Sequence, residues 1–353
     1  MSGLRLPGLV EVHAHTRDPG QTHKEDWDTV SAAALAGGFT TLLAMPNTSP
    51  PVVDSPSLVV ASLAARDSRV DYGLFAGATD GNAESVPTLA PATVGLKMYL
   101  DHTYGDMRLG DLEVWWRHLE NWPQHAPVAV HAEGPSLGTA ILMAEMLERP
   151  VHLCHVSRRD EIRLVARAKE RGIPVTCEVT PHHLFLDASN ASESGGRWSV
   201  RPPLGSPEDR AALWDHLDAI DCFATDHAPH TVEEKDSDDP PPGFPGLETA
   251  LGLLLGAVHE GRLEVEDLVV RLHERPRSIF GLPEQPDTWI EVDPDERWTV
   301  RATDLRSRAG WSPFEGQRLK GRVTLVVIRG EKAFDGGEVI APIGAGGDVK
   351  EGA

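Results

Sequence analysis

Residues 9–20 read LVEVHAHTRDPG, and this stretch carries both features from which the fold is predicted. The run from Gly8 to His13 is short, apolar and β-branched, as β-strands are. His13 and His15 stand where that strand should end. Seven further runs of the same kind occur, at 39–45, 71–78, 93–99, 127–131, 151–154, 174–179 and 222–225. The chain therefore contains eight predicted strands.

Segments with helical spacing lie in most of the intervals between these strands. Examples are 24–36, closed by Gly37 and Gly38, then 134–147, and 158–170, closed by Gly172. Strand and helix alternating eight times in roughly 230 residues predicts an α/β fold, a closed (β/α)₈ barrel of the TIM type. An open doubly wound sheet is the weaker alternative, because no glycine-rich dinucleotide fingerprint follows the first strand.

The pattern changes after the eighth strand. Residues 235–246, KDSDDPPPGFPG, predict a loop over one face, and two helices follow at 247–259 and 265–274. From about residue 281 the sequence is polar, with short strand-like pieces at 324–329 and 338–340. We therefore expect residues 1–280 to form the barrel. Residues 281–353 should form a small β appendage that packs on it and is not an independent domain.

Composition restricts the partners and the compartment. The 353 residues include 33 Lys and Arg against 54 Asp and Glu, and the net charge of −21 repels phosphate backbones and anionic membranes. Three cysteines are too few for a disulfide framework and suit a reducing cytoplasm. The chain has neither an apolar run of ~18 residues nor a signal-peptide pattern. We expect a free-standing cytoplasmic protein that binds neither nucleic acid nor membrane.

Reactive side chains collect at the predicted C-terminal strand ends, where a barrel of this kind carries its active site. Because side chains on a strand alternate, His13 and His15 share one face and Lys97 points into the barrel. The other polar residues at these ends are His131, Cys154, His155, Glu178, Asp226 and His230. Taken singly, a His-x-His pair also fits a solvent-facing site, and Lys97 could pair with an interior carboxylate. Their convergence on one rim favours a site for zinc-like ions.

Two metals in this set would need one shared ligand. The histidines and Asp226 supply three or more ligands to each metal only if one group bridges the pair. A neutral lysine amine cannot bridge two cations, whereas an N-carboxylated lysine can, because its carbamate is an anion with two oxygens. Lys97 is therefore the candidate bridge.

Seven motifs together resemble one family. They are HAHTRDPG (13–20), AMPNTSPP (44–51), GLKMYL (95–100), HAE (131–133), CHV (154–156), CEVTPHHLFL (177–186) and FATDHAPHTVEEK (223–235). The chain resembles the dihydroorotases of the amidohydrolase superfamily, above all the dihydroorotase domain of the animal multifunctional pyrimidine-synthesis protein. The likeness extends from Leu6 through 240–249 to 311–316, which is almost the whole chain.

The resemblance implies a metal-dependent barrel and a ligand set. His13, His15 and Asp226 would hold one zinc together with carboxylated Lys97, which bridges to a second zinc on His131 and His155. Cys154 and Glu178 stand where the animal-type enzymes hold a third zinc. The implied reaction is the reversible cyclisation of N-carbamoyl-L-aspartate to L-dihydroorotate in pyrimidine (UMP) biosynthesis, through a hydroxide shared by the zincs and with Asp226 as general acid/base.

The resemblance also implies the substrate contacts. The family binds the substrate carboxylate at positions matched here by Arg17, Asn47 and His230, and it uses further contacts matched by Arg201, Pro242 and Gly243. Thr103 and Tyr104 match a mobile loop that closes over substrate, with Tyr104 where the animal enzyme has phenylalanine. A homodimer and an association with aspartate transcarbamoylase are family expectations.

Two other functions stay open. The chain could be a different cyclic-amide hydrolase, a hydantoinase or an allantoinase, with the same paired-metal site. Arg17 and Asn47 favour the dihydroorotase. It could also be a silent barrel that scaffolds aspartate transcarbamoylase, although every ligand position is filled.

Overall fold

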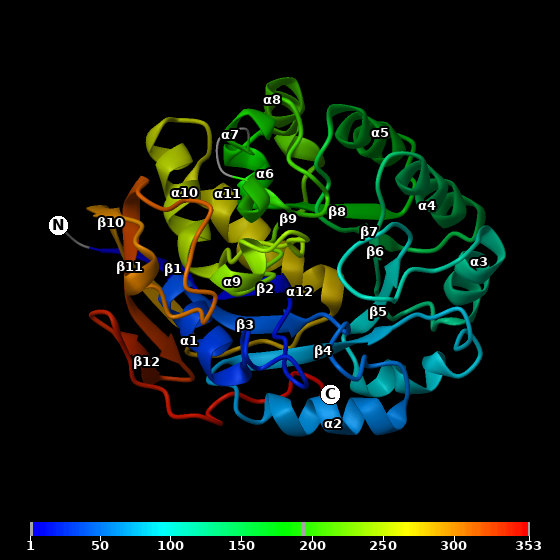
Figure 1. Ribbon diagram of the computed structural model, residues 1–353, viewed down its shortest axis with the longest axis horizontal. Helices are drawn as coiled ribbons and strands as arrows, with labels where there is room; N and C mark the ends of the chain where they lie inside the picture. The colour runs from blue at the N-terminus through cyan, green and yellow to red at the C-terminus, as the bar shows by residue number, and fades with distance from the viewer. Residues whose placement is uncertain (1–2, 192–194, 352–353) are drawn as a thin grey trace.

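The computed structural model describes residues 3–191 and 195–351, and its centre is a parallel sheet of eight strands (Figure 1). The strands follow one another around the sheet in chain order. A single bridge between Ala14 and His227, with His15 N donating to His227 O at 2.8 Å, joins the last strand to the first. The predicted barrel is confirmed, and each of the eight predicted runs contains one strand. The strands are β2 (Leu9–Ala14), β3 (Phe39–Ala44), β4 (Asp71–Gly77), β5 (Gly95–Tyr99), β6 (Val128–His131), β7 (Val151–Leu153), β8 (Val175–Val179) and β9 (Cys222–Phe223).

Helices connect the strands and surround the barrel (Figure 1). The α-helices are α1 (Trp27–Gly37), α2 (Ser55–Ala65), α3 (Leu112–Asn121), α4 (Pro135–Met146), α5 (Arg159–Glu170), α6 (Pro181–Phe185), α7 (Ala188–Ala191), α8 (Pro207–Asp215), α9 (Val232–Lys235), α10 (Leu247–His259), α11 (Val265–Val269) and α12 (Arg275–Phe280). A π-helical turn, η4 (Val270–Glu274), joins α11 to α12. Short 3₁₀ turns are η1 (Val86–Ala92), η2 (Gly195–Trp198), η3 (Leu217–Ala219) and η5 (Ala302–Asp304).

Helix α1 shows how local sequence sets the ends of an element. Asp26 accepts a hydrogen bond from Thr29 N at 2.9 Å and caps the first turn. Gly38, in the left-handed region at φ 85°, ends the helix. The sequence predicted a start at Lys24, but the capping aspartate moves the start to Trp27. Residues 24–26 are thereby left in a loop at the mouth of the barrel.

A second, antiparallel sheet stands beside the barrel, at the left of Figure 1. Its strands, in sheet order, are β1 (Leu4–Pro7), β10 (Trp289–Thr299), β11 (Arg318–Ile328), β12 (Glu331–Asp335) and β13 (Glu338–Val339). The predicted piece at 324–329 overlaps β11, while β10 and β12 are additional. Since β1 pairs with β10, residues Leu4–Pro7, which the sequence analysis assigned to the barrel, belong to the second sheet. The rest of the division at residue 280 stays a prediction.

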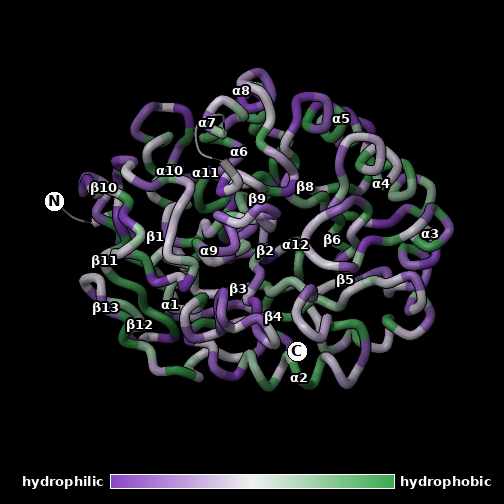
Figure 2. Tube along the Cα trace, in the orientation of Figure 1, coloured by the Kyte–Doolittle hydropathy of each residue, from purple (hydrophilic) through white to green (hydrophobic). Residues whose placement is uncertain are grey.

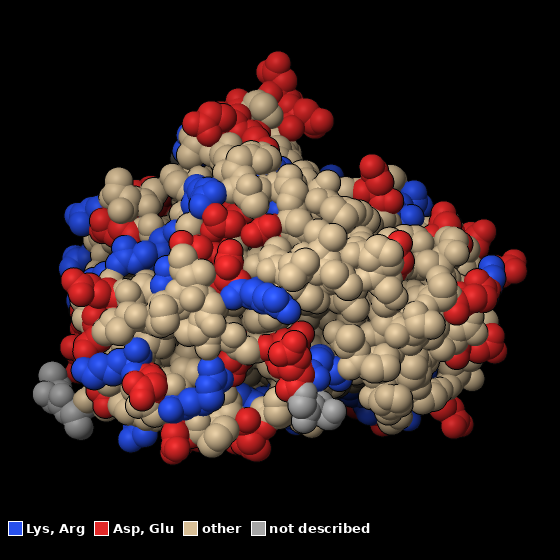
Figure 3. All heavy atoms as spheres, turned by 90° about the horizontal axis from the view of Figure 1, so that it is seen from below, with Lys and Arg blue, Asp and Glu red and all other residues tan. Residues whose placement is uncertain are grey.

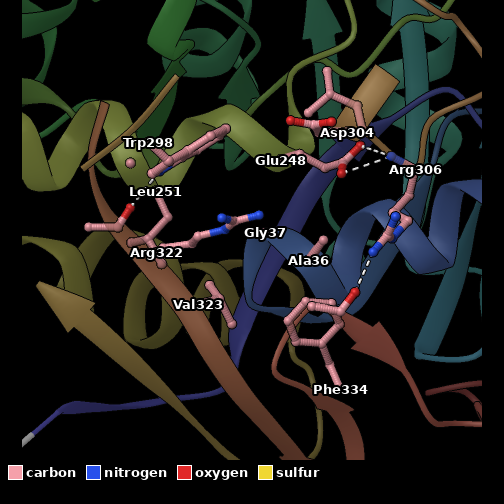
Figure 4. A pocket seen from close by; sticks show the side chains of 14 residues that line it. Ala36, Gly37, Glu248, Leu251, Trp298, Asp304, Arg306, Arg322, Val323 and Phe334 are labelled. Carbon is pink, nitrogen blue, oxygen red and sulfur yellow. Dashed lines mark hydrogen bonds between the residues drawn. The ribbon is translucent and has the colours of Figure 1, made fainter. Parts of the chain in front are cut away.

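Polar contacts connect the second sheet to the barrel helices around a small pocket (Figure 4). Glu248 on α10 accepts hydrogen bonds from Arg306 N at 2.8 Å and Ser307 N at 3.1 Å. At the same pocket but within the second sheet, Trp298 Nε1 on β10 donates to Gly321 O on β11 at 3.0 Å. The chain then returns to the barrel, where Val349 N donates to Tyr72 O at 2.8 Å. The C-terminal region thus contacts the barrel both at α10 and at β4.

The surface is acidic, with local apolar areas. On the face drawn in Figure 3, acidic and basic side chains are interleaved, and a broad uncharged area covers the right half. Helix α2 lies at the periphery and is coloured hydrophobic over part of its length in Figure 2. It exposes Val59, Val60 and Leu63. None of the described helices is long and apolar enough to cross a lipid bilayer.

Candidate metal centre and substrate pocket

The ends of β2 and β9 bring two histidines onto one carboxylate. His15 Nε2 lies 3.1 Å and His13 Nε2 lies 3.3 Å from Asp226 Oδ1, and all three side chains are buried. Asp226 has φ 46°, in the left-handed region that a non-glycine residue seldom adopts. Burial opposes its ionisation, but His13 and His15 hold the pKa of Asp226 below its ordinary value. The carboxylate is therefore ionised at neutral pH.

The ends of β6 and β7 bring two more histidines together. His131 Nδ1 and His155 Nε2 are 3.0 Å apart, and both rings are buried. Burial lowers the pKa of both imidazoles, so both are neutral and offer lone pairs. Two nitrogen ligands of one tetrahedral zinc lie about 3.3 Å apart at Zn–N distances of 2.0–2.1 Å. This spacing fits a metal ion shared by His131 Nδ1 and His155 Nε2.

Lys97 on β5 lies between these two groups. Its side chain is 0% exposed, and Nζ lies 3.0 Å from Cys154 Sγ and 3.4 Å from His13 Nε2. Within the described ranges Lys97 forms no ion pair, so an interior carboxylate does not neutralise it. A bare ammonium among metal ligands would oppose cation binding, whereas conversion of the amine to an anion removes that opposition.

Glu178 on β8 contacts the same cluster of histidines. One carboxylate oxygen contacts His13 Nδ1 and accepts from His155 N at 3.2 Å, and the other lies 3.1 Å from His152 Nε2. Burial alone would raise the pKa of Glu178, but His13 and His152 hold it well below its ordinary value. His13, Cys154 and Glu178 form a second group with ligand atoms within 4.8 Å of one another, beside the group of His13, His155 and Asp226. Glu178 can thus orient His13 or bind a metal itself.

A cationic pocket adjoins the centre. The Arg17 side chain is 2% exposed; its Nε donates to Pro229 O at 3.1 Å, and one terminal nitrogen lies 3.1 Å from His230 Nε2. Its other terminal nitrogen, Nη1, is buried without a hydrogen-bond partner among the described residues. Asn47 Oδ1 lies 2.6 Å from His15 Nδ1, which leaves Nε2 of that ring facing Asp226. A buried guanidinium with a free donor is suited to a carboxylate ligand.

Comparison with known proteins identifies the family of this chain. A family profile described as Dihydro-orotase-like matches residues 3–72. The chain is 50% identical, over 98% of its length, to the multifunctional protein CAD of Squalus acanthias. It is 37% identical, over 98% of its length and 87% of that protein, to the dihydroorotase of Pyrococcus abyssi. This chain belongs to the dihydroorotase family. It spans only 16% of the length of the CAD protein.

Solved structures place this dihydroorotase-family chain among two kinds of barrel. An L-hydantoinase from Arthrobacter aurescens superposes with a TM-score of 0.92 at 26% identity, covering 98% of this chain and 89% of that one. An inactive dihydroorotase-like domain of the Chaetomium thermophilum CAD-like multifunctional protein superposes with a TM-score of 0.85 at 29% identity, covering 99% of both chains.

The remaining family-derived positions fall into two sets. Pro242 O lies 3.0 Å from His230 Nε2, and Gly243 is close-packed at φ 145°, where an added Cβ would lie 2.4 Å from Ala228 O. Both therefore border the cationic pocket. Arg201 is exposed, and together with the hydrogen bond to His131 its charge lowers the pKa of Glu133 against the opposing effect of burial. Thr103 is half-buried in the loop after β5.

Several buried residues at the mouth of the barrel were not predicted from the sequence. Lys24 is buried and lies 3.1 Å from His230 Nδ1. Lys235 is buried and donates to Ser199 O, Pro241 O and Gly243 O, which fixes the proline-rich loop. Tyr99 has a buried hydroxyl that lacks a partner among the described residues. Tyr99 shares the face of Lys97 on β5, so strand alternation could have singled it out.

Proposed function

We propose that this chain is a zinc-dependent dihydroorotase that interconverts N-carbamoyl-L-aspartate and L-dihydroorotate in pyrimidine biosynthesis. The observation that carries the proposal is Arg17, whose free Nη1 is buried beside the histidine and aspartate cluster. Both substrate and product keep a free α-carboxylate, which is the ligand such a donor requires. Family membership supports the same reaction.

In this proposal His13, His15 and Asp226 would hold one zinc, His131 and His155 would hold a second, and carboxylated Lys97 would be a ligand common to both. Cys154 and Glu178 would hold a third. Bound zinc would supply a Lewis acid for the attacked carbonyl and would lower the pKa of water. The buried, neutral imidazoles and the ionised Asp226 are the donor set that zinc prefers.

The chain's own residues then divide the work. Asp226 moves the proton: in ring opening it accepts one at its carboxylate and passes it to the departing ring nitrogen, and in closure it does the reverse. Arg17, Asn47 and His230 bind and orient the α-carboxylate, and Arg201, Pro242 and Gly243 add contacts around the ring. Thr103 and Tyr104 belong to the loop that shields the reacting atoms from water.

The test is turnover in both directions by purified protein, with hydantoin and allantoin as competing substrates. We expect carbamoyl-aspartate cyclisation to dominate, at least two zinc ions per chain, and an intact mass raised by one carboxyl group. Lys97→Ala should lose the added mass, the zinc and the activity together. Lys169→Ala, on the outer helix α5, is the control. A zinc-loaded wild type that does not turn over carbamoyl-aspartate contradicts the proposal.

The second candidate, a hydantoinase, is favoured by the superposition on the hydantoinase barrel. Hydantoins lack the α-carboxylate, so that candidate leaves the free donor of Arg17 unexplained. Homodimerisation, docking to an aspartate transcarbamoylase and a cytoplasmic location are further proposals, supported by the multifunctional relatives. Light scattering of the protein alone and of its mixture with the transcarbamoylase tests the first two.

A further inference from the structure

The hydroxyl of Tyr104 is held by two donors from a different part of the chain. Lys24 Nζ donates to it at 2.8 Å and Gln21 Nε2 donates at 3.0 Å. Both donors precede helix α1, whereas Tyr104 lies in the loop between β5 and α3, 80 residues away from Lys24. The backbone is held as well, because Asn47 Nδ2 donates to Tyr104 O at 3.4 Å.

The Tyr104 ring covers the cationic pocket. Its centroid lies 4.8 Å from that of His230 in an edge-on arrangement and 4.9 Å from Arg17 Cζ. Lys24 Nζ lies 4.5 Å from the same ring, so two cations face the aromatic side chain. Gly105, at φ 95° with open space around it, follows directly and allows the backbone to turn there. The loop is therefore closed over the groups proposed to bind the substrate carboxylate.

Lys24 has a second contact that reaches the pocket itself. Its ammonium donates to His230 Nδ1 at 3.1 Å, which favours the tautomer protonated at Nε2, and Nε2 can then donate to Pro242 O, 3.0 Å away. In that tautomer Arg17 Nη2, 3.1 Å from the same Nε2, contacts the ring nitrogen without donating to it. Glu234 Oε1 lies 3.1 Å from the same ammonium and keeps this buried charge paired. One side chain thus connects the closed loop to the orientation of His230.

We propose that Lys24 is a positioning residue with two actions: through the Tyr104 hydroxyl it holds the loop 101–109 closed, and through Nδ1 it fixes the tautomer of His230. The proposal deepens the proposed function and rests on it for the role of the pocket. A phenylalanine at position 104 would keep the ring and lose the hydroxyl. This chain therefore has a stronger loop closure than one with phenylalanine there.

The experiment compares Tyr104→Phe, Lys24→Met and the double variant with wild type, using zinc-loaded full-length protein. Lys169→Met is the matched control, because that lysine likewise combines a carboxylate partner, Asp221, with a neutral acceptor, Ala219 O at 2.7 Å, but lies on α5. The first readout is hydrogen exchange of the amides of residues 101–109 without substrate. The second is the KM and kcat of the cyclisation.

Both single variants should exchange these loop amides faster, by roughly tenfold to a hundredfold for Tyr104→Phe, because a hydrogen bond to a charged donor is lost. The double variant should match Tyr104→Phe, since both changes break the same bond. The KM of Lys24→Met should rise more than the KM of Tyr104→Phe, because only Lys24 orients His230. The KM of the double variant should likewise exceed that of Tyr104→Phe. The kcat should change much less than KM.

Loop exchange within twofold of wild type in both single variants would overturn the closure, and equal KM values would overturn the action on His230. Faster exchange in Lys169→Met would show that loss of any ion-paired lysine is enough, which also overturns the proposal. Hydrogen exchange is measured without substrate, so it tests the loop closure whether or not the protein is a dihydroorotase. A wild type that does not turn over carbamoyl-aspartate contradicts the proposed function alone.

Discussion

Replacement of Arg17 by methionine tests the proposed carboxylate pocket most directly. Arg17 is 2% exposed; its Nε donates to Pro229 O, Nη2 lies 3.1 Å from His230 Nε2, and Nη1 has no hydrogen-bond partner among the described residues. Burial lowers the pKa of Arg17 to about 10, so it remains charged at neutral pH. A hydrogen bond between charged partners contributes about 1.5–3 kcal/mol, which corresponds to a loss of roughly 10- to 150-fold in kcat/KM. Because the carboxylate is bound in both ground state and transition state, the loss should appear mainly in KM.

The assay is the initial rate of ring opening with two substrates, dihydroorotate and dihydrouracil, the second of which lacks the carboxylate. Arg17→Met should be impaired with the first and close to wild type with the second. The control is Arg167→Met, which removes an arginine side chain that is 76% exposed on α5. Equal impairment with both substrates would refute the reasoning, because it would mean that Arg17 supports the fold or the metal centre and does not bind the carboxylate.

Three further predictions concern the metal, its outer ligands and pH. Treatment with a chelator should abolish turnover and lower the Tm, and added zinc should restore both, because ligand binding to the native state stabilises it. Asn47→Leu removes the acceptor of His15 Nδ1, and a titration with a competing chelator should show zinc affinity reduced about 10- to 100-fold. Burial lowers the pKa of His183 to about 4. Between pH 6.5 and 4 the unfolded chain therefore binds more protons than the folded chain, and the free energy of unfolding decreases as the pH falls through that window. Denaturant titrations at pH 7 and pH 4 should show wild type losing about 3 kcal/mol more than His183→Gln; equal losses would contradict the assignment.

The sequence predicts the barrel well because its strands are locally encoded. Each strand is a short β-branched run, and alternation along β5 is enough to turn Lys97 inward. Convergence of the ligands then follows from the topology of parallel strands. Strand β1 was missed because its partner β10 lies more than 280 residues away and contains Pro294 at an irregular pairing. No local pattern encodes such a contact.

Lys24 was missed for a related reason. It precedes a helix, where a lysine is usually solvated, and its burial comes from Tyr104 and His230 on two distant loops. Arg201 presents the opposite case: family likeness assigns it to the substrate, its side chain is exposed, and its contact with the substrate stays a prediction. Tertiary neighbours decide which of several cations at a barrel mouth is buried, and these neighbours are loops whose sequence has no periodicity.

The candidate metal centre, and not the fold, distinguishes an active enzyme from a catalytically silent scaffold. The Chaetomium thermophilum domain described as inactive superposes on this chain with a TM-score of 0.85, so the barrel itself is compatible with either. Burying His13, Lys97, Glu178 and Asp226 together in one place is costly, and apolar residues of similar volume would give a more stable barrel. A scaffold has no need of such a cluster. A buried, charged and incompletely hydrogen-bonded cluster is therefore explained by a ligand that needs it, and the metal ions and carboxylate substrate proposed above match its charges.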